Sequence, residues 1–151
     1  MNLRTARASD ETAILALTER LADFPLPPGR THREIAVADH PIIRAQLADP
    51  REDVLCVVAE ESGEVIGVIF ANTRLDYFTG APAAYIEVLA VAEQGAGRGA
   101  ARRLMEAVET WAGGRGLHRV ELSVFAANAR ARGFYEHLGY QPEFVRYVRD
   151  V

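Results

Sequence analysis

A glycine-rich junction at residues 94–99, called here the glycine loop, constrains the fold of this chain more than any other feature. It follows an apolar, strand-like stretch, precedes a stretch with helical spacing, and consists of Gln94-Gly95-Ala96-Gly97-Arg98-Gly99. Glycine lets a backbone turn sharply and approach a ligand closely. A helix N-terminus adds unpaired N–H donors and a partial positive charge. The junction therefore predicts a strand-loop-helix unit that binds a phosphate or pyrophosphate group.

Three classes of phosphate site compete for this loop. A P-loop is excluded because it needs a lysine, whereas all 17 basic residues of this chain are arginine. A dinucleotide fingerprint fits in part, through Gly95, Gly97 and Ala100, with Glu121 at about the right distance for a ribose contact. Glu121, however, begins a predicted strand, and too little chain follows to complete a nucleotide-binding half. The third class is a loop for the pyrophosphate of coenzyme A. A connection without any ligand accounts poorly for three glycines in five residues.

Length and composition narrow the function classes. We expect residues 1–151 to form one domain, in the cytoplasm, because no signal-peptide pattern or membrane-length apolar run is visible. The single cysteine, Cys56, lies in an apolar run and is expected in the core, so no cysteine-based metal site is predicted. The net charge of −4 gives no indication of nucleic-acid binding.

Hydrophobic spacing predicts a mixed α/β or α+β fold. Alternating or apolar runs indicate strands over residues 3–7, 54–60, 65–72, 84–91, 120–125 and 144–148. The second and third of these strands are expected to form a hairpin. Helical spacing indicates helices over residues 9–21, 33–47, 100–112 and 128–138. This order of elements predicts helices packed on a mixed sheet.

A second motif follows the glycine loop in the order found in one known superfamily. It reads Asn128-x-x-Ala131-x-x-Phe134-Tyr135-x-x-Leu138-Gly139-Tyr140. Together with the loop, it resembles the GNAT superfamily of N-acetyltransferases over residues 84–140. The resemblance implies a mostly antiparallel sheet flanked by helices, in which two parallel strands, 84–91 and 120–125, splay apart and form an acetyl-CoA cleft. Arg98 departs from the family, which usually has an apolar residue there.

The resemblance also implies a coenzyme site. Pantetheine would lie beside the first of these strands, held by the backbone of Leu89, Ala90 and Val91. The pyrophosphate would bind backbone amides of the loop and the helix start, at Gln94, Gly95, Ala96, Gly97, Arg98, Gly99 and Ala100. Asn128 would help to hold the coenzyme arm, although Asn is also a favoured N-cap residue.

The expected reaction is direct transfer of an acetyl group from acetyl-CoA to a primary amine in a ternary complex. An alkyl amine has a pKa of roughly 10, so a general base must remove a proton first. Glu87 is the candidate, since strand alternation predicts Tyr85, Glu87 and Leu89 on one face. A solvated or paired edge residue explains Glu87 equally well. The four histidines are weaker candidates for the base.

Tyr135 is the candidate acid that protonates the departing thiolate, on the strength of its place in the motif. A plain core tyrosine beside Phe134 is the alternative. A backbone N–H near Leu89 or Ala90 would stabilise the oxyanion.

Other features leave the biological role open. A non-catalytic acyl-CoA-binding regulatory domain is the alternative function within the same fold. The acceptor, a small-molecule or peptide amine, is not identified, and specificity is expected in residues 22–50 and 73–83. Aromatic residues in or near these segments, Phe24, Tyr77, Phe78 and Tyr147, are candidates to line its pocket. Family resemblance makes a homodimer possible, and no metal or membrane partner is predicted.

Overall fold

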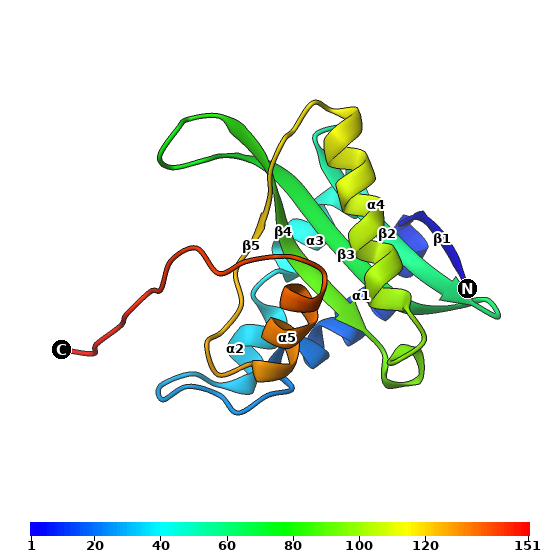
Figure 1. The fold of residues 1–151 in the computed structure, drawn as a ribbon. Coiled ribbons are helices and arrows are strands. Elements are labelled where there is room, and N and C mark those ends of the chain that lie inside the picture. Colours follow the sequence, from blue (N-terminus) through cyan, green and yellow to red (C-terminus); the bar gives the residue numbers. More distant parts are fainter.

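The computed structural model describes residues 1–151 and shows a five-stranded sheet with helices on both faces (Figure 1). The strands are β1 (Asn2–Thr5), β2 (Val54–Glu61), β3 (Glu64–Leu75), β4 (Pro82–Val91) and β5 (Val120–Leu122). The α-helices are α1 (Glu11–Thr18), α2 (His32–Val37), α3 (His40–Ala48), α4 (Ala100–Gly114) and α5 (Ala129–His137). Short 3-10 helices are η1 (Ala8–Asp10), η2 (Glu19–Ala22) and η3 (Glu93–Gly95).

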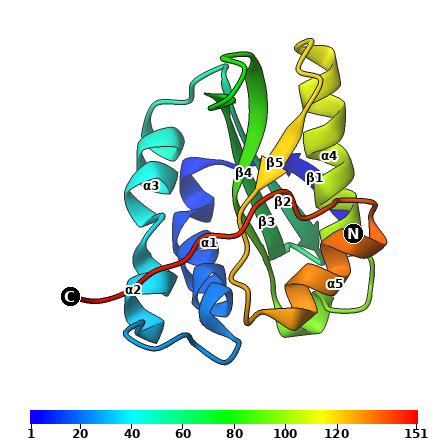
Figure 2. The same cartoon turned by 60° about the vertical axis from the view of Figure 1, so that its left-hand side comes forward.

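The strands lie in the order β1-β2-β3-β4-β5, antiparallel except for the parallel pair β4–β5. Figure 2 shows α1, α2 and α3 on one face of the sheet and α4 on the other. The predicted fold class is therefore confirmed, with the mostly antiparallel sheet and its one parallel pair.

Two hydrophobic cores fill the two faces of this sheet. The α4-side core consists of Val57, Ala59, Ile66, Ile69, Ala71, Ala84, Ile86, Leu104, Met105, Val108, Ala112 and Leu117. The α1-side core consists of Ile14, Leu17, Ile43, Leu47, Cys56, Val58, Val68, Phe70, Val88 and Ala90. Neighbouring residues of β2 and β3 alternate between the two cores, as the period of a strand requires. The apolar runs of these strands follow from burial on both faces.

A β-bulge interrupts β4 at Glu87. Val88 is opposite Phe70 and Ile86 is opposite Ala71, so Glu87 is an extra residue without a partner on β3. The extra residue reverses the alternation: Ile86 belongs to the α4-side core, whereas Val88 belongs to the α1-side core. Leu89 packs against the α4-side core. The prediction that Leu89 shares a face with Glu87 is therefore wrong, because a bulge shifts every later residue to the other face.

Beyond the bulge, β4 and β5 separate. Their pairing covers only Ala84–Ile86 against Val120–Leu122, while β4 continues to Val91. The predicted strand 120–125 is thus only three residues long. The separation leaves one edge of β4 unpaired from Glu87 onward and opens the sheet between two strands.

The predicted helix at 33–47 is in fact two helices, α2 and α3, which meet near Asp39. Pro41, in the first turn of α3, explains the break. Proline has no N–H to donate to Val37, and its ring clashes with the carbonyl of the preceding turn. The same proline is well tolerated at the start of a new helix.

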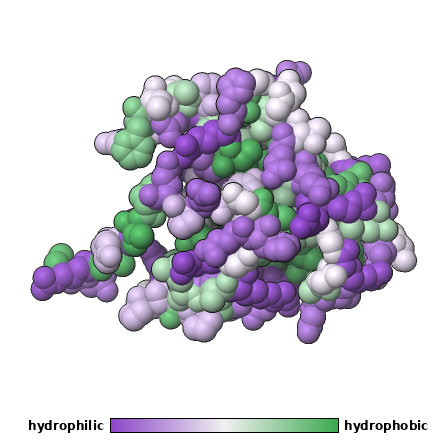
Figure 3. Space-filling model, viewed as in Figure 1, coloured by the Kyte–Doolittle hydropathy of each residue, from purple (hydrophilic) through white to green (hydrophobic).

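Residues 144–148 do not form the predicted last strand. No backbone hydrogen bond of the structure involves any residue after Tyr140, and the chain leaves the body as an extended segment (Figure 1). Figure 3 shows apolar groups along this segment, where Phe144, Val145, Tyr147 and Val148 are exposed. The alternation that predicted a strand has no neighbouring strand to pair with, and β propensity alone does not create one.

Candidate active site

A cavity of about 1170 Å³ lies where β4 and β5 separate. One wall is the second half of β4, and another consists of the glycine loop and the first turn of α4. The chain after β5, Ser123–Phe125, and α5 form the opposite side, while η2 and α2 close the far end. The cavity is therefore built around the unpaired edge of β4.

Each glycine of the loop is required for its own reason. Gly97 and Gly99 have φ angles of 73° and 80°, in the left-handed region that favours glycine. Gly95 is buried, and a Cβ there would lie 2.9 Å from Cγ1 of Val91. The loop therefore depends on glycine both for its turn and for its close contact with β4.

The loop and the helix start present a set of unpaired N–H groups. No acceptor within the protein is found for the backbone amides of Gly97, Gly99, Ala100, Ala101 and Arg102. By contrast, the amides of Gly95, Ala96 and Arg98 donate to nearby carbonyls, at distances of 3.0 to 3.3 Å between nitrogen and oxygen. Three of the available donors, Gly97, Gly99 and Ala100, thus fall within the predicted range, and two more, Ala101 and Arg102, follow it in the first turn of α4.

Most residues predicted for the coenzyme line the cavity. They are Leu89, Ala90, Val91, Gly95, Ala96, Gly97, Gly99, Ala100 and Asn128. Gln94 and Arg98 are not in the lining. The guanidinium of Arg98 instead pairs with the carboxylate of Glu61, with nitrogen-oxygen distances of 2.5 and 3.0 Å. The binding role of all eleven residues stays a prediction.

Asn128 caps α5. Its side-chain Oδ1 accepts a hydrogen bond from the amide of Ala131, at 3.0 Å. The N-cap alternative is thereby confirmed, and the residue also faces the cavity. Two arginines, Arg102 and Arg130, lie in the lining without any ion pair; Arg102 was expected to add charge at the rim of the phosphate site, whereas Arg130 was not singled out from the sequence. Each stands in the first turn of a helix, α4 or α5, and this position is visible in the sequence.

Glu87 faces the cavity and is also paired, so the alternative of a paired residue is confirmed, while its role as the general base stays a prediction. Its side chain is 12% exposed. Its Oε1 accepts a hydrogen bond from Nδ2 of Asn72 at 2.9 Å and pairs with the guanidinium of Arg74. Its Oε2 makes no hydrogen bond within the protein. One oxygen of the carboxylate is thus fixed by two donors, while the other remains available.

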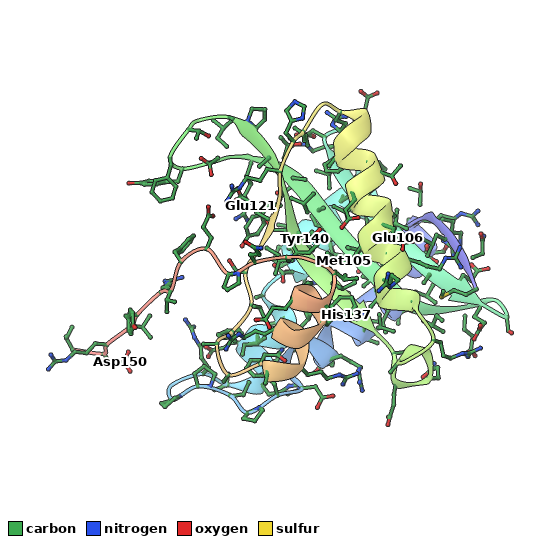
Figure 4. The ribbon with its side chains drawn as sticks, viewed as in Figure 1. Met105, Glu106, Glu121, His137, Tyr140 and Asp150 are labelled. Atoms are coloured by element: carbon green, nitrogen blue, oxygen red, sulfur yellow. The ribbon has the colours of Figure 1, made fainter.

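Tyr135 lies in the cavity wall with its ring against Phe134 and Tyr140, at centroid distances of 5.3 and 6.1 Å. Its hydroxyl makes no hydrogen bond within the protein, whereas the hydroxyl of Tyr140 donates to Glu109. Figure 4 labels Tyr140, which follows α5 in the chain. Burial raises the pKa of Tyr135 to about 12. The phenol is therefore neutral at physiological pH and keeps a hydrogen that it can donate there.

The remaining candidates lie elsewhere. Of the four histidines, only His137 is in the cavity lining. Nε2 of His40 lies 2.8 Å from the hydroxyl of Thr18, and His32 is exposed beside Glu19. Phe24 contacts Phe125 at a centroid distance of 5.2 Å, but Tyr77, Phe78 and Tyr147 are exposed and outside the lining. The predicted acceptor aromatics are thus not gathered at the cavity.

Comparisons with known proteins bear directly on this arrangement. The sequence profile of the acetyltransferase (GNAT) family matches residues 15–140. The chain belongs to this family. The uncharacterized N-acetyltransferase YhfO of Bacillus subtilis (strain 168) is 29% identical to it, over 100% of this chain and 98% of that protein. The expected enzyme class, an acetyl-CoA-dependent N-acetyltransferase, is confirmed with the family.

Solved structures share the fold of this GNAT protein. The aminoglycoside 6′-N-acetyltransferase AAC(6′)-IG of Acinetobacter haemolyticus superposes with a TM-score of 0.73 at 18% identity, over 100% of this chain and 99% of that one. AAC(6′)-Iy, solved with a bisubstrate analog that contains CoA, superposes with a TM-score of 0.72 at 22% identity, over 99% and 97% of the two chains.

None of the helices of this GNAT protein combines the length and the apolar character needed to cross a bilayer. No group of three or more His, Cys, Asp or Glu side chains is placed to hold a metal ion.

Proposed function

We propose that this protein transfers the acetyl group of acetyl-CoA directly to a primary amine of a small molecule or peptide, with both substrates bound at once. The observation that carries the proposal is the set of five unpaired amides, from Gly97 to Arg102, at one end of the cavity. Such a set at a helix N-terminus is suited to a pyrophosphate. Arg102 and Arg130 supply the matching positive charge.

The unpaired edge of β4 supports the position of the pantetheine arm. Past Ile86 no strand covers this edge, so backbone N–H and C=O groups of Leu89 to Val91 are available to an extended ligand. An amide-containing chain can pair there as an added strand. This position would place the thioester beside Glu87 and Tyr135, which line the same cavity.

The reaction follows from these groups. Oε2 of Glu87, directly or through water, takes a proton from the amine, and the neutral nitrogen attacks the carbonyl carbon of the thioester. A backbone N–H of Leu89 or Ala90 stabilises the resulting oxyanion. The C–S bond then breaks and its electron pair leaves on sulfur, while the extra proton on the acylated nitrogen passes to that sulfur, so that the products are an amide and a thiol. The neutral hydroxyl of Tyr135 donates a hydrogen bond to that thiolate and supports its departure.

The first test is calorimetric titration of acetyl-CoA into the protein, with NAD and ATP as competing ligands. Two matched variants locate the site: Gly97→Glu and Gly63→Glu. Both glycines have positive φ and open space around the position of a Cβ, but only Gly97 lines the cavity. We expect Gly97→Glu to abolish binding, through charge repulsion of the pyrophosphate, and Gly63→Glu to retain it. Tighter binding of NAD, or equal effects of the two variants, would contradict the proposed site.

Turnover is the second arm of this test. Release of coenzyme A thiol is measured with a panel of amines, which includes aminoglycosides because both structural neighbours are named for them. Saturable binding without thiol release for any amine would instead support a regulatory acyl-CoA-binding domain.

A further inference from the structure

The part of the cavity farthest from the glycine loop, called here the acceptor end, is lined by carboxylates, of which some form ion pairs and one does not. Four carboxylates line it: Asp23, Glu34, Asp39 and Glu87. Three of them have an arginine partner. The nitrogen-oxygen distance is 3.5 Å for Asp23 with Arg20 and 3.0 Å for Glu34 with Arg30, and Glu87 pairs with Arg74. Only Asp39 makes no ion pair.

Asp39 also lacks any other side-chain partner. It stands at the N-cap of α3, but its side chain does not cap the helix. A capping aspartate would accept a hydrogen bond from the first turn. Here the half-buried carboxylate faces the cavity instead, with neither a hydrogen bond nor a salt bridge.

Three charged or titratable side chains act on Asp39 from the neighbouring elements. Glu87 on β4 adds negative charge, whereas Arg74 on β3 and His40 on α3 act in the opposite sense. Arg74 already forms an ion pair with Glu87, and the ring of His40 lies within hydrogen-bond distance of the hydroxyl of Thr18. Burial, and then the charge of Glu87, raise the pKa of Asp39. A carboxylate in this state gains from a cation supplied by a ligand.

Two free positive charges lie elsewhere in the lining. Arg102 and Arg130, at the N-termini of α4 and α5, are suited to phosphates. The cavity thus has an unpaired carboxylate at the acceptor end and unpaired guanidinium groups at the starts of α4 and α5. Such an arrangement favours a cationic acceptor over an anionic one.

We propose that Asp39 binds a second positive charge of the acceptor, so that the substrate class is diamines or polyamines rather than monoamines or amino acids. The inference rests on the proposed function. The nitrogen that is acetylated must be neutral when it attacks, so an ion pair to that nitrogen would stabilise the ground state and not the transition state. An ion pair to a second, unreacting ammonium stabilises both states and improves binding.

The test compares three probes of similar size: 1,4-diaminobutane, butylamine and 4-aminobutyrate. Besides the amine that reacts, the first probe carries a second positive charge, the second carries no further charge, and the third carries a negative charge. We expect kcat/KM to be at least about tenfold higher for the diamine than for butylamine, and lowest for 4-aminobutyrate. Asp39→Asn should lower the diamine value about tenfold, mainly through KM, and leave butylamine unchanged. Asp39→Glu should retain part of the preference.

Asp49→Asn is the matched control, since Asp49 stands at the other end of α3, outside the cavity. Equal kcat/KM for the three amines, turnover of none of them, or an equal loss on all three in Asp39→Asn would overturn the inference. Calorimetry of acetyl-CoA on the same preparations separates the two proposals. Intact coenzyme binding without charge discrimination overturns only the role of Asp39, whereas absent coenzyme binding overturns the proposed function itself.

Discussion

Tyr135 and Tyr140 lie close together, but their hydroxyl groups differ in their hydrogen bonding. Burial raises the pKa of both, but Tyr140 is also hydrogen-bonded to Glu109. Tyr135 lies in the cavity wall, and its hydroxyl has no hydrogen-bond partner within the protein. The motif around Tyr135 allowed this residue to be singled out from the sequence. Asp39 could not be predicted, because nothing in residues 22–50 shows which carboxylates will find an arginine.

Replacing the hydroxyl of Tyr135 therefore tests a role in turnover. We expect Tyr135→Phe to lower kcat about 100-fold, the lower range for a lost proton donor, with little change in the KM for acetyl-CoA. Activity should not decline between pH 8 and 10 through this tyrosine, because its pKa of about 12 keeps it protonated. Steady-state kinetics of thiol release measures both.

Tyr140→Phe is the matched control for that variant. It removes a hydroxyl that lies outside the cavity lining, so kcat should stay within about twofold of the unmodified enzyme. A similar loss in both variants would mean that the tyrosines act through packing.

At the scale of elements, the junction of β1 and η1 shows how a short 3-10 helix is held to the sheet. Asp10 is 7% exposed and accepts hydrogen bonds from the guanidinium of Arg4 at 2.7 and 2.9 Å. It also accepts one from the amide of Arg7 at 2.7 Å. The Nε–H of Arg4 also donates a hydrogen bond to Oε2 of Glu60 on β2, at a nitrogen-oxygen distance of 2.7 Å. This network connects the first strand to the helix layer.

The side-chain bonds from Arg4, followed by the amide of Arg7, lower the pKa of Asp10. Because the folded-state pKa lies below the unfolded one, this stabilisation is complete above about pH 4 and is lost as the pH falls through the folded value. We expect Asp10→Asn to cost about 2 kcal/mol at pH 7, with the difference from the unmodified protein shrinking on acidification. Urea unfolding at several pH values measures this.

The control for Asp10→Asn is Asp53→Asn. Asp53 forms a solvent-exposed pair with Arg51, so its loss should leave the urea midpoint unchanged. Equal midpoints for Asp10→Asn and the unmodified protein would contradict the structural role of the network.

The strand β4 shows how far elements can be predicted. Its position follows from an apolar run, and the family resemblance implied its parallel partner β5, but neither predicts the bulge at Glu87, since no residue type marks it. The break between α2 and α3 was missed although Pro41 marks it, because the apolar spacing around it remained helical.

At the scale of the whole molecule, the mostly antiparallel sheet, the helices that flank it and the parallel strands that separate agree with the expected fold. The C-terminal segment does not. A strand forms only where a neighbour has free hydrogen-bonding groups in register, and this long-range condition cannot be judged from residues 144–148 themselves. The oligomeric state and the acceptor likewise depend on molecules outside this chain.

Hydrogen exchange tests this arrangement directly. We expect the slowest exchange in β3 and the paired part of β4, which are central and buried on both faces. Backbone amides after Tyr140 should exchange at the rates of an unstructured peptide, because none is hydrogen-bonded. Protection at residues 144–148 would show that this segment pairs with a strand after all.

An open sheet ordinarily has two edges, but the separation of β4 from β5 gives this one a third, in its interior. Free edges are where sheets recruit strands from other chains and aggregate. With pantetheine along β4, the coenzyme would take the place of a missing strand. The cosubstrate would then also protect the folded chain from aggregation, and the enzyme would be most vulnerable in the interval between releasing one coenzyme molecule and binding the next.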